Sequence, residues 1–221
     1  MTVILMALAC ADDRALLTVP VATSTSASEL SPADGVTVTL TRAELTLSDL
    51  RMEGPATTAL RWAPPRLIAT AHAHPGHDFA GQVGGELVGT WTLDLLAAPV
   101  DLGAASCYTG AYATARLNLE PSPGVTLEGV ATTLGGDVPF RFVVEPDQEV
   151  TGVPFEVVLD EAAPPEGVTL AVDLEHALSF VDWATPDTDG DGALTTADGS
   201  LANTVLFGVV ATPTFTLNLE Q

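Results

Sequence analysis

The residues with the clearest chemistry are four aspartates in one stretch near the C-terminal end. Residues 187–198 read DTDGDGALTTAD, so aspartate stands at positions 1, 3, 5 and 12 of the stretch. Carboxylate oxygens are the hard ligands that Ca²⁺ prefers, and aspartates on alternate residues of a tightly curled loop converge on one point. Gly192, at position 6, allows a sharp backbone turn that a residue with a Cβ resists. The spacing therefore predicts a calcium-binding loop.

The remaining positions of the loop fit the same role. The carbonyl oxygen of position 7 and the hydroxyl of position 9 add oxygen ligands, and Leu194, at position 8, is expected to face the core and anchor the loop. The last aspartate is expected to close the coordination sphere from the start of an exit helix. The predicted calcium ligands are Asp187, Asp189, Asp191, Ala193, Thr195 and Asp198.

This pattern resembles the EF-hand loop, and the resemblance covers only residues 187–198. Aspartate rather than glutamate at the last position resembles the calcium loops of dockerin modules. Because Asp198 is shorter than glutamate, we expect weak binding, with a dissociation constant on the order of 10⁻⁴–10⁻³ M. The expected role of the ion is structural, to rigidify a long loop. The alternative is an Asp- and Gly-rich surface turn that binds nothing.

A second cluster of ligand-type side chains lies in residues 71–78, which read AHAHPGHD. On a strand, His72 and His74 share one face. The Pro-Gly pair that follows allows a turn that brings His77 and Asp78 back towards them. Three imidazoles and a carboxylate can bind Zn²⁺ or Cu²⁺, so the cluster is predicted as a transition-metal site. The alternative is a solvated turn with only adventitious affinity for such metals.

The first residues predict a compartment. Residues 1–10, MTVILMALAC, are apolar but too short to cross a membrane, which needs about 20 residues. They are typical of the end of a signal peptide, and the last four, ending at Cys10, resemble the lipobox of bacterial lipoproteins. The resemblance implies a lipid on Cys10 and a location outside the cytoplasm, in the bacterial cell envelope. The alternative is a short hydrophobic strand.

The prediction of a lipid anchor bears on the segment after Cys10 and on the second cysteine, Cys107. Residues 11–34 are rich in threonine, serine and alanine, and we expect a flexible tether there. If Cys10 carries a lipid, Cys107 has no disulfide partner and is expected to be a buried core residue. A disulfide between Cys10 and Cys107 is the alternative.

Residues 35–221 are predicted to form one antiparallel β-sandwich. Short runs rich in Val, Thr, Leu and Phe are separated by Pro- and Gly-containing turns. The expected strands cover 36–40, 45–47, 90–95, 113–119, 125–127, 138–144, 155–159, 168–174 and 214–219. A phase change at 42–44 predicts a bulge or a break between the first two. Residues 174–183 predict a short helix that Pro186 ends. The expected fold class is all-β, with one short helix-loop-helix calcium insertion near the C-terminus.

The charge balance excludes several functions. The chain has 29 Asp and Glu against 7 Lys and Arg, all of them arginine, and a net charge of −22. Such a chain cannot neutralise nucleic-acid phosphates, and anionic lipids repel it, so a lipid anchor is the expected membrane contact. No Gly-x-Ser-x-Gly, His-Glu-x-x-His or dinucleotide motif is present. We expect no enzyme, with a metal-dependent hydrolase at the histidines as the least favoured alternative.

These observations predict an extracytoplasmic metal-binding lipoprotein. It would hold a structural Ca²⁺ and a Cu or Zn ion at the histidines, and would capture the transition metal or deliver it to a membrane protein partner. Its layout is similar to that of bacterial extracytoplasmic copper-binding sandwiches. The alternative is a non-enzymatic, calcium-stabilised structural or adhesion module, in which the histidines are exposed and have no transition-metal role.

Overall fold

The computed structural model describes residues 14–55 and 83–220. Of these residues, 59% lie in strands and 10% in helices, which confirms the β-rich class. The elements in chain order are β1 (Leu16–Thr23), β2 (Glu29–Ala33), β3 (Val36–Glu53), β4 (Val83–Asp94), β5 (Asp101–Tyr108), β6 (Gly110–Leu119), β7 (Val125–Thr133), β8 (Gly136–Val144), β9 (Gln148–Leu159), β10 (Gly167–Val172), α1 (Leu174–Leu178), β11 (Leu194–Thr195), α2 (Leu201–Val210), a 3₁₀ turn (Thr212–Thr214) and β12 (Phe215–Glu220).

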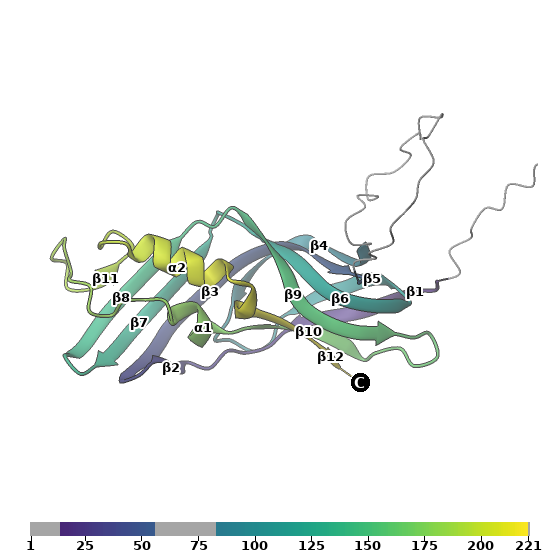
Figure 1. The fold of residues 1–221 in the computed structure, drawn as a ribbon, viewed down its shortest axis with the longest axis horizontal. Coiled ribbons are helices and arrows are strands. Elements are labelled where there is room, and N and C mark those ends of the chain that lie inside the picture. The colour runs from purple at the N-terminus through teal and green to yellow at the C-terminus, as the bar shows by residue number, and fades with distance from the viewer. Residues whose placement is uncertain (1–13, 56–82, 221) are drawn as a thin grey trace, which may run out of the picture.

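The described strands join in one large sheet that is not closed. Its main path runs β11-β8-β7-β3-β4-β5-β1-β10-β12, with β2 beside β3 and a branch from β3 through β6 to β9. The sheet is mixed rather than purely antiparallel, because β1 pairs with β10, and β11 with β8, in parallel. Figure 1 shows an elongated molecule, with β7 and β8 towards one end and β1, β5 and β6 towards the other. The two-sheet sandwich stays a prediction.

Strand β3 organises this sheet. Its first half pairs with β2 and β7, and its second half with β4 and β6. The register with β7 shifts between Leu40 and Arg42, which confirms the bulge predicted from the phase change in the sequence. A second irregularity follows at Asp49, whose φ of 50° is rare outside glycine. With these two irregularities, β3 pairs with β2 and β7 along its first half and with β4 and β6 along its second half.

The prediction of a flexible tether over residues 11–34 is wrong for the two parts of that segment that form β1 and β2. Strand β1 pairs with β5 and β10, and Val19 and Val21 are 1% and 0% exposed. The threonine- and alanine-rich composition suits a linker, but alternate residues of this segment face the core, so it folds as a strand. Cys107 on β5 is also fully buried, which confirms its predicted place in the core. Burial raises the pKa of its thiol to about 11.

The two helices lie on either side of the aspartate loop in the chain. Helix α1 begins where the sequence predicted, because Asp173 caps it by accepting a hydrogen bond from the His176 N–H, but it ends at Leu178, before the predicted 183. Helix α2 packs closely on α1: a Cβ on Gly208 would lie 2.0 Å from the carbonyl oxygen of Ala177. Neither helix in the described ranges has the length and hydropathy of a membrane-spanning segment.

Candidate metal centre

The aspartate loop is attached to the sheet on both sides. On its C-terminal side, Leu194 is 2% exposed and lies on β11, opposite Phe140 of β8. This confirms the anchor role predicted for Leu194. On the N-terminal side, the buried Trp183 packs against Phe140 and Phe142, with ring centroids 5.2 and 6.0 Å apart. The exposed turn between these anchors is therefore held against β8.

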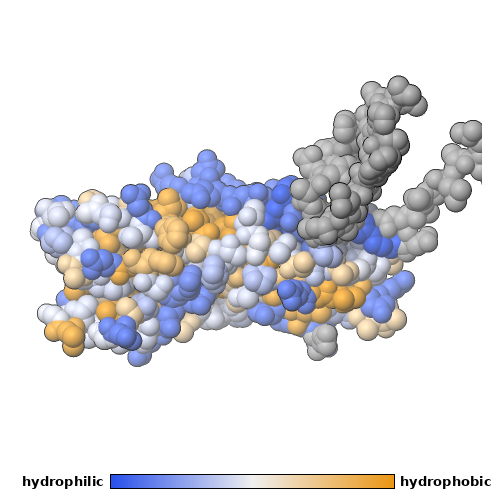
Figure 2. Space-filling model, in the orientation of Figure 1, coloured by the Kyte–Doolittle hydropathy of each residue, from blue (hydrophilic) through white to orange (hydrophobic). Residues whose placement is uncertain are grey.

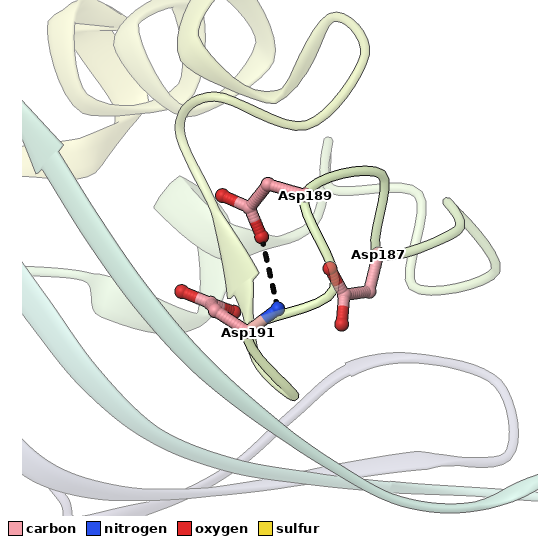
Figure 3. A group of neighbouring side chains, drawn as sticks. All are labelled: Asp187, Asp189 and Asp191. Atoms are coloured by element: carbon pink, nitrogen blue, oxygen red, sulfur yellow. Dashed lines mark hydrogen bonds between the residues drawn. The ribbon is translucent and has the colours of Figure 1, made fainter.

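Three of the predicted ligands lie together on this turn. One carboxylate oxygen from each of Asp187, Asp189 and Asp191 lies within 4.8 Å of the others, and all three residues are exposed (Figure 3). Calcium binds oxygen at 2.3–2.6 Å, so two of its ligand atoms can be at most about 5 Å apart. The spacing of the three carboxylates therefore fits one calcium ion.

Backbone N–H groups hold these carboxylates in place. Asp187 accepts hydrogen bonds from Gly190 at 2.6 Å and from Gly192 at 2.9 Å. Both glycines have positive φ, 76° and 87°, as predicted for the turn at Gly192. Asp189 accepts a bond from the Asp191 N–H at 3.2 Å, the dashed line in Figure 3, and Asp191 accepts one from Ala193 at 2.9 Å. The curled backbone thus positions each carboxylate.

The carboxylates differ in their electrostatics. The N–H groups of Gly192 and Gly190 lower the pKa of Asp187. The N–H of Asp191 lowers the pKa of Asp189 as well, but partial desolvation and the charges of neighbouring aspartates outweigh it, so the pKa of Asp189 is raised. Part of this rise comes from the negative charges of Asp191 and Asp198, and a bound cation would offset that repulsion.

Asp198 has a different environment from the three exposed aspartates. It is 0% exposed, and each of its two carboxylate oxygens accepts two hydrogen bonds. Oδ1 accepts from the N–H and the hydroxyl of Thr188, at 2.7 and 2.6 Å. Oδ2 accepts from the N–H and the hydroxyl of Thr195, at 2.9 and 3.2 Å. The bonds from Thr188, followed by those from Thr195, lower the pKa of Asp198 to about 2. Asp198 therefore ties position 2 of the loop to position 9.

The structure thus divides the predicted ligand set. It groups Asp187, Asp189 and Asp191, whereas Asp198 and the hydroxyl of Thr195 bond to each other. Coordination by Asp198, by Thr195 and by the carbonyl of Ala193 stays a prediction. The spacing of the aspartates did not predict the role of Thr188, whose N–H and hydroxyl both donate to Asp198. A hydroxyl residue at position 2 was the only signal for that role.

The other predicted sites are not covered by the described residues. His72, His74, His77, Asp78 and the lipidation site Cys10 all lie outside the described ranges, so the transition-metal site and the anchor stay predictions. Cys107 and His176 are also of transition-metal ligand type and lie in the described ranges, and Cys107 is buried in the core. His176 lies on α1, where its ring packs edge-on against Phe180 at 5.3 Å.

Comparison with known proteins assigns no family. No family model, curated protein or solved structure matches the chain. Evidence on the function therefore comes from the chemistry of the described residues. That chemistry consists of three convergent exposed carboxylates on a turn that is anchored at Trp183 and Leu194.

Proposed function

We propose that this chain is a calcium-stabilised β-rich protein whose aspartate loop, residues 187–198, holds one Ca²⁺ in a structural role. The convergence of Asp187, Asp189 and Asp191 within 4.8 Å supports the proposal most directly. The ion would offset the repulsion among these carboxylates and fix the segment that joins α1 to α2. The loop would then be the calcium-binding insertion of the fold.

The proposed location is outside the cytoplasm. Extracellular calcium modules have dissociation constants of about 10⁻⁴–10⁻³ M, and such sites fill only where calcium is abundant. The apolar segment that ends at Cys10 and the net charge of −22 agree with a secreted, lipid-anchored protein that does not contact anionic lipids directly. Metal capture at the 71–78 histidines is a separate proposal that rests on the sequence alone.

Calorimetric titration with CaCl₂ tests the calcium proposal. We expect one ion per chain in the unaltered protein and no binding heat in the double variant Asp189→Asn/Asp191→Asn, which removes two of three converging charges. Asp147→Asn is the matched control, because Asp147 is an exposed aspartate outside the loop. Equal binding by both variants, or no heat from the unaltered protein at millimolar calcium, would contradict the proposal.

A further inference from the structure

An exposed apolar surface lies where α1 and α2 meet. The Phe180 ring packs edge-on against His176 at 5.3 Å and against Phe207 at 5.0 Å, both at 87°. Phe207 is 59% exposed and Phe180 37%, and the partly buried Leu206 and Val210 lie on the same stretch of α2. We call these five residues the aromatic patch. Figure 2 shows hydrophobic surface over α2, which is yellow in Figure 1.

Below the aromatic patch, α1 and α2 are in close contact. Gly208 lies against the Ala177 carbonyl so closely that no side chain fits between them, and a Cβ there would also lie 3.2 Å from Phe180. The two helices therefore cannot separate without losing this contact. Aromatic side chains bury large apolar areas when a partner covers them, and exposed apolar patches on soluble proteins commonly mark interaction sites.

The segment of the chain that holds the aromatic patch carries acidic residues and no basic ones. Residues 142–221 contain 15 Asp and Glu and no Lys or Arg, so the last 80 residues carry −15 of the net −22. Within them, the 21 residues 199–219, which include α2, have no charged side chain. Exposed carboxylates flank the patch in sequence on and beside α1, at Asp173, Glu175 and Asp182. An uncharged apolar surface thus lies within an acidic part of the chain.

We propose that the aromatic patch binds a cationic amphipathic segment of a partner protein, in which lysine or arginine flanks leucine- or phenylalanine-type side chains. The apolar side chains would cover Phe180 and Phe207, and the cations would face the carboxylates around α1. A second copy of the chain would instead bring carboxylates against carboxylates. The proposal goes beyond the calcium site and does not depend on it.

Fluorescence anisotropy with a labelled helical peptide of leucine and lysine tests this proposal, in buffer with EDTA so that calcium does not contribute. A scrambled peptide of the same composition, whose leucines do not form one face, controls for charge alone. We expect Phe207→Ser to weaken binding of the amphipathic peptide by about tenfold or more, as for a central interface residue. Val158→Ser is the matched control, because Val158 is 70% exposed on β9. It is expected to leave the affinity unchanged.

Further measurements distinguish a cationic amphipathic partner from a second copy of the chain and from a lipid surface. Weaker binding of the scrambled peptide, and weaker binding by Glu175→Gln, would support a cationic amphipathic partner. Equal affinity of both peptides, or an unchanged affinity of Phe207→Ser, would overturn the proposal, since charge alone would then explain binding. Dimerisation in sedimentation velocity that Phe207→Ser abolishes would also overturn it, in favour of a second copy. So would binding to phosphatidylcholine vesicles that depends on Phe207.

Discussion

Two neighbouring regions of this molecule differ in the groups that bond to their carboxylates. On the sheet face of β3, β7 and β8, guanidinium groups neutralise them: Arg42 bonds Glu44 at 2.7 Å, and Arg141 bonds Glu128 at 3.2 Å. In the aspartate loop, the three exposed carboxylates lie within 4.8 Å of one another and their bonds come from backbone N–H groups. The regions adjoin, because Thr195 on β11 pairs with Arg141 on β8.

The difference separates two ways of balancing negative charge in an acidic chain. Arginine is scarce, with 7 residues against 29 acids, and on the sheet face it forms pairs within the protein. In the loop, backbone N–H groups donate to the three converging carboxylates, and this arrangement favours a cation from solution. Calcium should therefore act on the loop, whereas changes in salt should act on the sheet face.

The largest expected effect comes from breaking the attachment between the two regions. Leu194→Ala removes a fully buried side chain that anchors the loop on β8, and such changes cost about 2–5 kcal/mol of unfolding free energy. Urea unfolding measures the loss. Leu134→Ala is the control, since that leucine is fully exposed at the β7–β8 turn and should change little. Equal, small losses in both variants would show that the loop is not anchored there.

The second effect is the stabilisation by calcium. At a calcium concentration about 100 times the dissociation constant, an ion bound only to the folded state adds about 2.7 kcal/mol. Thermal unfolding with and without CaCl₂ should show this gain in the unaltered protein but not in Asp187→Asn, which removes one of the three converging carboxylates. If Asp187→Asn kept the full gain, the ion would bind elsewhere.

A third prediction concerns acid. The pKa of Asp198 is about 2 in the folded protein, below its ordinary 3.8, so its ionised form stabilises the fold above about pH 4. That contribution is lost as the pH falls from about 4 towards 2. Asp189, whose pKa is raised, acts in the opposite direction, since its protonation relieves repulsion.

Acid unfolding followed by circular dichroism checks this expectation. Asp198→Asn should be less stable at neutral pH and should lose less stability between pH 4 and 2 than the unaltered protein. Asp147→Asn, at an exposed aspartate outside the loop, should behave like the unaltered protein. An unchanged acid profile in Asp198→Asn would show that the bonds from Thr188 and Thr195 do not stabilise the loop.

The smallest effect is expected on the sheet face. Arg141 has a 64% exposed side chain, so Arg141→Gln should cost at most about 1 kcal/mol, and the cost should shrink in high salt. The unfolding free energy that calcium adds to this variant should equal the amount that it adds to the unaltered protein. A reduced gain in this variant would mean that the two regions do not respond separately.

Parts of the fold could be predicted because local pattern and burial agree. The phase change in the sequence predicted the bulge in β3, and the apolar spacing after residue 173 predicted the start of α1. Strand β1 was missed because its threonines and alanines have the composition of a linker. Its burial depends on β5 and β10, which are far away in the chain.

The candidate site could also be predicted only in part. Alternating aspartates and Gly192 indicate a curled loop, because the turn and the convergence are local properties of the backbone. The contact of Asp198 with Thr188, ten residues away in the chain, is not local in that sense. Spacing gives its position in the loop, but whether its oxygens accept bonds from Thr188 and Thr195 depends on how the turn folds.

The most direct test of the calcium site is an NMR titration that follows the amide signals of Gly190 and Gly192, the two donors to Asp187. With millimolar CaCl₂, we predict shifts of these signals that saturate at one ion per chain and are confined to residues near 187–198. Unchanged glycine signals, or calcium shifts that appear only in other parts of the chain, would contradict the account.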